Sequence, residues 1–290
     1  MDHPLRIGVK LSPQATTVDD LRAVWRIADE GDFDNVWGFD HFAAIGGPPE
    51  RPTYEGWTML AAMAEATKRV RIGLLVTGAT YRHPGVLAKI ATTVDHLSLG
   101  RLEFGIGSGW AENEHTMLGM PFHTVAGRIR RMEETIEVCK RLWTEERSTF
   151  EGKYFRLEDA IHEPKPIQKP FPPIWIGGSG EELTLRVAAR HADVWNPSGG
   201  GGDPDEAARL SGVLDERCHE VGRDPGAIRR SVQHRFDPSD PAAWHDRSRQ
   251  YIERGFTEIV AQLSGADPPR QADQLAEKVL PELRAAATQR

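Results

Sequence analysis

Apolar residues alternate along the chain between short runs and helical periodicities. Short, mostly apolar runs of four to eight residues favour buried strands, and apolar side chains that recur every three or four residues favour helices with one packed face. The clearest stripe covers residues 125–143, which we expect to pack against the core. Strands are predicted at 5–11, 35–39, 70–77, 101–107, 174–176, 193–195, 228–234 and 257–262, and helices at 17–30, 57–67, 84–97, 125–143, 181–190, 203–221, 241–254 and 272–287.

The order of these elements predicts the fold. A small hairpin is expected at 148–157 and an extended proline-rich stretch at 164–173. The remaining elements make roughly eight strand–helix units, and such alternation favours a parallel sheet covered by helices. A (β/α)8 TIM barrel typically takes about 250 residues. We therefore predict an α/β fold, a (β/α)8 barrel with short insertions in the loops after the strands, over one domain of residues 1–290, in preference to an open doubly wound sheet.

Composition narrows the setting in which this domain works. The net charge of −7 and the isoelectric point near 5.9 argue against nucleic acid or an anionic membrane as a partner. The two cysteines, Cys139 and Cys218, suggest neither a disulfide framework nor a zinc site. No apolar stretch approaches the ~18 residues of a membrane span, and residues 1–11 lack a signal-peptide core. A cytoplasmic enzyme is the expectation.

Glycine, polar and aromatic residues gather where the predicted strands end, which is where barrel enzymes place their chemistry. Residues 177–180 read Gly-Gly-Ser-Gly between a strand and a helix. Exposed amides there could cradle a phosphate, or the segment could be a tight turn with Ser179 as the helix cap. The glycine turn of Gly107 to Gly109 lacks the dinucleotide-binding spacing and better suits a flat ring.

Two further groups of ionisable residues follow predicted strands. Asp40 and His41 end the second strand, where a histidine can shuttle a proton near neutral pH or can simply bind backbone. Glu112, Glu114 and His115 follow Trp110, and without metal-ligand spacing we expect them in a solvated loop.

Several motifs together strongly resemble the luciferase-like monooxygenase superfamily, and within it the branch that depends on coenzyme F420, a 5-deazaflavin. The resemblance is carried by residues 80–89, 93–102, 105–110, 172–180 and 188–196. It implies that His41, with Asp40, assists the chemistry, and that a non-prolyl cis peptide near Leu74, Leu75 or Val76 backs the cofactor ring. The implied cofactor-binding residues are Leu75, Val76, Thr77, Thr80, Gly107, Ser108, Gly109, Trp110, Gly177, Gly178, Ser179, Gly180 and Asn196.

One departure limits what can be carried over. The sugar-phosphate dehydrogenase of the family has a glutamate directly after the glycine turn, where this chain has Trp110, with Glu112 two residues on. We transfer neither that acid nor that substrate, and Trp110 is expected to form an aromatic wall.

Three functions follow as hypotheses. The first is hydride transfer between F420 and an organic small molecule. The second is FMN-dependent monooxygenation with a separate reductase that supplies reduced cofactor. The third is a metal-assisted hydrolase built on Asp40, His41, His83 and Glu112. We favour the first and expect no bound metal. The resemblance also implies a homodimer, and the segments 42–52 and 198–203 are expected to shape the substrate side.

Overall fold

A closed parallel barrel forms the centre of the computed structural model, which describes residues 3–197 and 202–288. Within these residues the order β3-β2-β1-β11-β10-β9-β8-β5-β4, with an added pairing of β3 to β5, closes the sheet at eight strand positions. All pairs in it are parallel, which confirms the predicted (β/α)8 barrel. The barrel strands are β1 (Arg6–Leu11), β2 (Asn35–Gly38), β3 (Arg71–Leu74), β4 (Thr77–Gly78), β5 (Leu102–Gly107), β8 (Ile174–Gly177), β9 (Val194–Asn196), β10 (Arg229–Arg235) and β11 (Glu258–Leu263).

The third strand position is split in two. The sequence predicts one strand over 70–77, but β3 ends at Leu74 and β4 begins at Thr77, and both pair with β5. The Leu75–Val76 peptide between them is cis. The expectation of a non-prolyl cis peptide at this place is therefore confirmed, and the prediction of an unbroken strand is wrong.

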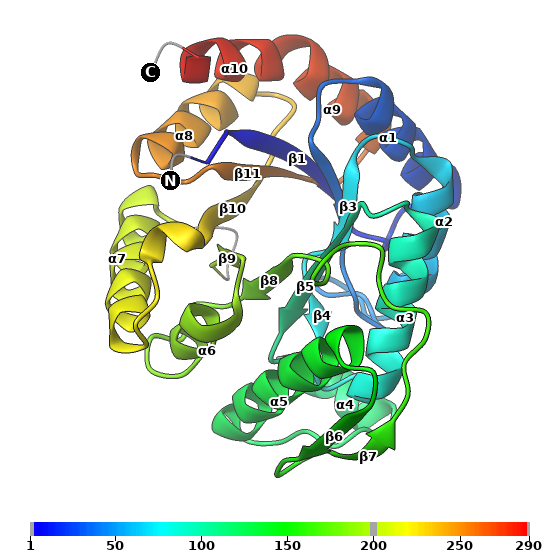
Figure 1. Ribbon diagram of the computed structural model, residues 1–290. Coiled ribbons are helices and arrows are strands. Elements are labelled where there is room, and N and C mark those ends of the chain that lie inside the picture. The colour runs from blue at the N-terminus through cyan, green and yellow to red at the C-terminus, as the bar shows by residue number, and fades with distance from the viewer. Residues whose placement is uncertain (1–2, 198–201, 289–290) are drawn as a thin grey trace.

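Helices surround the barrel (Figure 1). They follow the strands in chain order. The hairpin predicted at 148–157 is the antiparallel pair of β6 (Ser148–Glu151) and β7 (Arg156–Ala160), which forms a separate two-stranded sheet and extends to Ala160. Among the described residues, no helix is both long enough and apolar enough to span a membrane. The helices are α1 (Val18–Glu30), α2 (Gly56–Ala66), α3 (Pro84–Leu97), α4 (Glu112–Met117), α5 (Val125–Thr144), α6 (Thr184–His191), α7 (Pro204–Glu220), α8 (Pro241–Glu253), α9 (Pro268–Gln274) and α10 (Leu280–Thr288), with a π-turn at Leu275–Val279 and a short 3-10 turn at Pro225–Ala227.

Three helices differ from expectation. The helix predicted from residue 181 begins at Thr184, because the Leu185 amide binds the Gly180 carbonyl at 3.0 Å and closes a turn first. The helix predicted over 272–287 is three pieces, α9, the π-turn and α10. The short α4 was not predicted, since six residues give too little periodicity to detect.

Side chains fill the barrel interior at the end where the strands begin, which leaves the other end for a site. Charged side chains from the first or second residue of several strands fill the end where the strands begin: Arg71 contacts Glu103, and Arg229 contacts Glu258. An apolar cluster that includes Trp37 fills the next part of the interior. Because these groups close the amino-terminal end, any cavity must open at the carboxyl ends of the strands.

Candidate active site

A cavity of about 670 Å³ opens at the carboxyl ends of the barrel strands. Its wall includes every predicted site residue except Thr80. The Thr80 side chain is buried behind the wall, where a β-carbon on Gly109 would collide with it. The cavity-lining members of the predicted set are Asp40, His41, Leu75, Val76, Thr77, Gly107, Ser108, Gly109, Trp110, Gly177, Gly178, Ser179, Gly180 and Asn196.

His41 lies at the cavity wall in a largely aromatic setting. Its ring is packed edge-on against Phe39 and Trp110, with ring centres 5.0 and 5.5 Å away. Its Nδ1 atom lies 3.0 Å from a carboxylate oxygen of Glu114. Only 8% of the residue is exposed, so this contact is well shielded from water. The imidazole is therefore held in one orientation from three sides.

Glu114 is the fully buried centre of this arrangement. Its carboxylate accepts backbone N–H bonds from Phe42 and Ala43 at 2.7 and 2.9 Å and the hydroxyl of Tyr81. Burial by itself raises the pKa of Glu114, but the hydrogen bonds from His41, Tyr81 and the Ala43 amide outweigh it and hold the pKa at about 2. Glu114 is thus a carboxylate at any physiological pH.

The charge on Glu114 decides which nitrogen of His41 can accept a proton. A carboxylate only accepts hydrogen bonds, so Nδ1 of His41 has to carry the hydrogen in their contact. In the neutral ring Nε2 is then the acceptor. Burial, followed by the bond to Glu114, raises the pKa of Tyr81, so its hydroxyl stays protonated and donates. The network therefore gives His41 the form of a general base.

The expectation that Glu112, Glu114 and His115 lie in a solvated loop is wrong. All three belong to α4, where Glu114 and His115 are fully buried and Glu112 is exposed. The His115 ring stacks on Tyr81 with ring centres 5.3 Å apart. Sequence reasoning missed this because α4 is short and its buried face is made of polar side chains.

Asp40 has a different set of partners from its neighbour. Its carboxylate binds the guanidinium of Arg82 at 2.5 and 3.0 Å and accepts the hydroxyl of Thr77. Arg82 also pairs with Glu55, the capping residue of α2. Burial lowers the pKa of Arg82, but its bonds to Asp40 outweigh this effect, and the pKa is raised overall. Asp40 therefore joins β2, β4 and α2 beneath the cavity, with its charge already balanced.

Lys10 lies on the cavity floor and was not predicted. Its ammonium group donates to the Leu75 carbonyl, at the cis peptide, and to Gln233, both at 2.8 Å. Burial lowers the pKa of Lys10 to about 7. A lysine in an apolar strand carries no sequence signal that separates a buried position from a surface one.

Packing within the scaffold explains the glycines of the strand ends. A β-carbon on Gly107 or Gly177 would lie 2.8 or 3.1 Å from methyl groups of Val76. A β-carbon on Gly178 would lie 2.8 Å from Thr184, and Gly178 has a φ of +134°. Ser179 does not cap α6, whose N-cap is Leu183 without a side-chain bond, so the cap expected at Ser179 is wrong.

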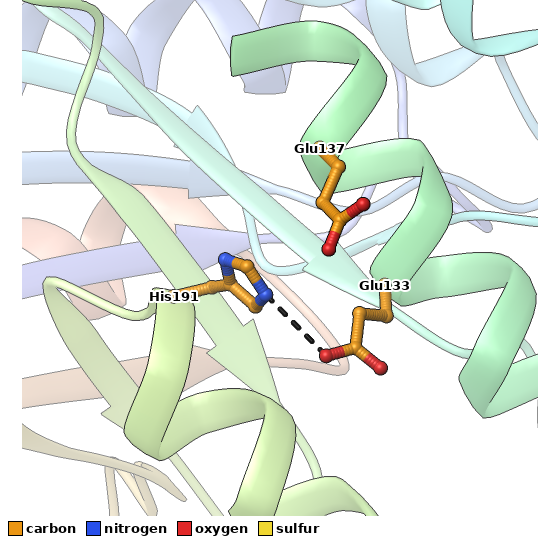
Figure 2. Close-up of side chains that lie close together, drawn as sticks. All are labelled: Glu133, Glu137 and His191. Carbon is orange, nitrogen blue, oxygen red and sulfur yellow. Dashed lines mark ion pairs between the residues drawn. The ribbon is translucent and has the colours of Figure 1, made fainter. Parts of the chain in front are cut away.

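A second cluster of ionisable groups lies away from the cavity. Glu133 and Glu137 on α5 face His191 at the end of α6, and their nearest ligand-type atoms lie within 4.8 Å of one another (Figure 2). Arg190 pairs with Glu133 at 2.6 Å, and the Lys140 ammonium lies 3.3 Å from Nδ1 of His191. Because these two cations already contact Glu133 and His191, we interpret the cluster as an ion-pair network between α5 and α6.

Comparisons with known proteins agree on one family. The luciferase-like monooxygenase family matches residues 3–289. A protein of Intrasporangium calvum named F420-dependent glucose-6-phosphate dehydrogenase is 31% identical over 343 residues, covering 97% of this chain and 99% of that protein. One of the same name from Microbacterium testaceum is 35% identical over 227 residues, covering 77% of this chain and 65% of that protein.

Among solved structures, a similar fold is found in an F420-dependent secondary alcohol dehydrogenase in complex with an F420–acetone adduct. The TM-score is 0.84 at 20% identity, and the superposition covers 97% of this chain and 100% of that one. At this identity the likeness supports the fold alone.

Proposed function

The chain belongs to the luciferase-like monooxygenase family, and we propose that it is an oxidoreductase that transfers hydride between coenzyme F420 and an organic small molecule. The observation that carries this proposal is the buried Glu114–His41 pair at the wall of a cavity large enough for a flat tricyclic ring. The names of the relatives, which are F420-dependent dehydrogenases, support the choice of cofactor.

The lining of the cavity fits a deazaflavin. The side chains of Leu75 and Val76 provide an apolar surface next to the strand ends, suited to the face of a ring. Asn196 and Gln233 provide amide groups for the polar edge of a ring. The loop of residues 177–180 would hold the phosphorylated tail through its backbone amides. When bound, the deazaflavin supplies a ring carbon that takes up or gives back hydride.

The protein residues supply the proton transfer. For oxidation of a hydroxyl group, Nε2 of His41 accepts the hydroxyl proton while the carbon loses hydride. Glu114 holds Nδ1–H of His41 and stabilises the positive charge that then forms on the ring. Tyr81 fixes the carboxylate of Glu114, and Asp40 with Arg82 fixes the strand end that carries His41. In the reverse direction the imidazolium returns the proton.

Cofactor identity is the first test. Purified protein is titrated with oxidised F420 and, separately, with FMN, and binding is followed by cofactor fluorescence and by the shift in melting temperature. We expect tight binding of F420 only. Tight binding of FMN alone would contradict the proposal and favour monooxygenation with a partner reductase.

The catalytic assignment needs its own test. We expect His41→Ala to lower kcat by about 10²–10⁴-fold, the usual contribution of general acid–base catalysis, with the Kd for F420 within about threefold of the parent. The control is His219→Ala, a change at an exposed histidine of α7. Normal turnover by His41→Ala would refute the role given to this residue.

The hydrolase hypothesis finds no support in the site. His83 caps α3 through Nδ1 and does not line the cavity, and Glu112 is exposed.

We further propose, from the family resemblance, that residues 1–290 form one domain and that two copies associate. Sedimentation velocity at micromolar concentration tests the association. Of the segments expected to shape the substrate side, Ile45 lines the cavity, and 198–201 lie outside the described residues.

A further inference from the structure

We propose that the substrate is an uncharged hydroxyl or carbonyl compound with an apolar body, and that it carries no phosphate or carboxylate group. This inference rests on the proposed function and goes further by naming the substrate class. It comes from a set of apolar side chains that line the cavity, which we call the apolar wall. The apolar wall consists of Phe39, Ile45, Trp110, Val125 and Ile129.

The first argument concerns charge. Among the described side chains that line the cavity, those able to carry charge are Lys10, Asp40 and His41. Asp40 is neutralised by Arg82, and the Lys10 ammonium is 5% exposed and bound to a carbonyl and an amide oxygen on the floor. The undescribed residues 198–201 read Ser-Gly-Gly-Gly and bring no cation.

A phosphorylated substrate would therefore have no arginine or lysine partner beside His41. Recognition of a phosphate dianion ordinarily uses such cations, because removing the dianion from water is costly without them. The residue after the glycine turn points the same way, since Trp110 presents an apolar indole to the cavity. The charge pattern thus disfavours sugar phosphates.

The second argument concerns the exposed apolar surface at the cavity mouth. Trp110 is 64% exposed and Val125 is 62% exposed, although both line the cavity. Exposed apolar surface beside a concave site marks a place where a ligand is covered. Val125 had been expected to pack in the core with the rest of its helix, and the structure corrects this. Ile129, one turn further along α5, is 93% buried and continues the same face inward.

Two members of the apolar wall, Phe39 and Trp110, lie close to the proton acceptor. The ring centres of Trp110 and Phe39 are 5.5 and 5.0 Å from that of His41. A molecule whose hydroxyl group reaches Nε2 of His41 would therefore place its substituents on these rings. The hydroxyl proton goes to Nε2, the hydride on the same carbon goes to the deazaflavin, and the product is a ketone or an aldehyde.

The test uses the F420-loaded protein and a graded series of secondary alcohols from 2-propanol to 2-octanol, with glucose 6-phosphate and glucose as comparisons. Binding of each compound is measured by saturation-transfer NMR and by its competition with 2-octanol. Turnover is followed by loss of F420 absorbance. We expect affinity to rise along the series by up to about fourfold per buried CH₂ and glucose 6-phosphate to bind more weakly than 2-octanol. A flat series, or tighter binding of glucose 6-phosphate, would overturn the inference.

Variants assign the effect to the apolar wall. Val125→Asp is expected to weaken 2-octanol binding at least tenfold. Trp110→Ala is expected to reduce the rise in affinity with the length of the alcohol. The matched control is Val86→Asp, a substitution at an exposed valine in the first turn of α3 that does not line the cavity. If Val125→Asp binds the series as the parent does, the inference is refuted.

The failure of this inference can be told apart from failure of the proposed function. The Kd for F420 is measured first for the parent and for each variant. A protein that binds F420 but prefers the sugar phosphate refutes the substrate class and leaves the proposed function standing. A protein that does not bind F420 refutes the proposed function itself.

Discussion

Replacing Glu114 by glutamine tests whether this buried carboxylate controls the protonation of His41. The carboxylate receives four donors: the His41 ring, the Tyr81 hydroxyl and the amides of Phe42 and Ala43. A glutamine keeps one carbonyl oxygen with two lone pairs and turns the other oxygen into an NH₂ group. At least two of the four donors must then lose their acceptor.

The cost can be worked from these contacts. Each lost hydrogen bond to a charged group is worth about 1.5–3 kcal/mol, so two lost bonds destabilise the fold by roughly 3–6 kcal/mol before relaxation. With about 2–4 °C per kcal/mol for a chain near this size, the melting temperature should fall by roughly 6–24 °C. For catalysis, the glutamine NH₂ can donate to Nδ1 of His41 and so favours the wrong tautomer. We expect kcat to fall by about 10²–10⁴-fold.

The assay separates this role from a merely structural one. Steady-state kinetics are measured over pH 5–9 for the parent, for Glu114→Gln and for Glu114→Asp, with the Kd for F420 measured alongside. In Glu114→Gln kcat/KM should fall across this whole pH range, because the wrong tautomer of His41 is favoured at every pH. Glu114→Asp should restore part of kcat, and Glu112→Gln, at the exposed neighbour in α4, should change neither. A Glu114→Gln protein with kcat within threefold of the parent across this pH range would refute the reasoning.

Three further outcomes are expected. Burial lowers the pKa of Lys10 to about 7 in the folded state, against 10.5 when unfolded, so the folded state binds fewer protons between these pH values. The free energy of unfolding should therefore rise with pH from about 7 to 10.5. Lys10→Met should remove this part of the pH dependence, which urea titrations at pH 7 and 9 measure. Gly107→Ala, whose β-carbon would meet a valine methyl at 2.8 Å, should lower thermal stability and F420 affinity, whereas Gly212→Ala in α7, with open space around it, should stabilise by about 0.5–1 kcal/mol. Arg82→Met leaves Asp40 buried without its cation and should cost about 3–5 kcal/mol in unfolding free energy, which Arg82→Lys should recover in part.

The barrel could be predicted from sequence because its signals are local and repeated. Short apolar runs and helical stripes give the order of the elements, and turn residues separate them, as for the helix that begins at Pro84 after its His83 cap. The failures lie where tertiary contacts outweigh such signals. The turn that delays α6 to Thr184 depends on glycines packed on that threonine, a contact that no local pattern contains.

The candidate site was predicted in outline but not in its connections. Strand-end position placed Asp40 and His41 at the cavity, yet their adjacency in sequence suggested a pair, and the structure gives each its own partner. The partner of His41 is Glu114, 73 residues away, and that of Asp40 is Arg82, 42 residues away. Long-range pairings of buried charges have no period or spacing in one sequence, so only the fold can reveal them.

The Asp40–Arg82 and His41–Glu114 pairs have different roles at the end of β2. Consecutive residues in an extended segment point to opposite sides, so Asp40 turns toward Thr77 and Arg82 in the scaffold while His41 turns toward α4. A buried ion pair on one side fixes the backbone, and a carboxylate on the other side fixes the ring and its proton. The aspartate therefore acts on the chemistry through position and the glutamate through charge. Neutralising Glu114 should therefore lower kcat at every pH, whereas removing Arg82 should mainly lower the free energy of unfolding.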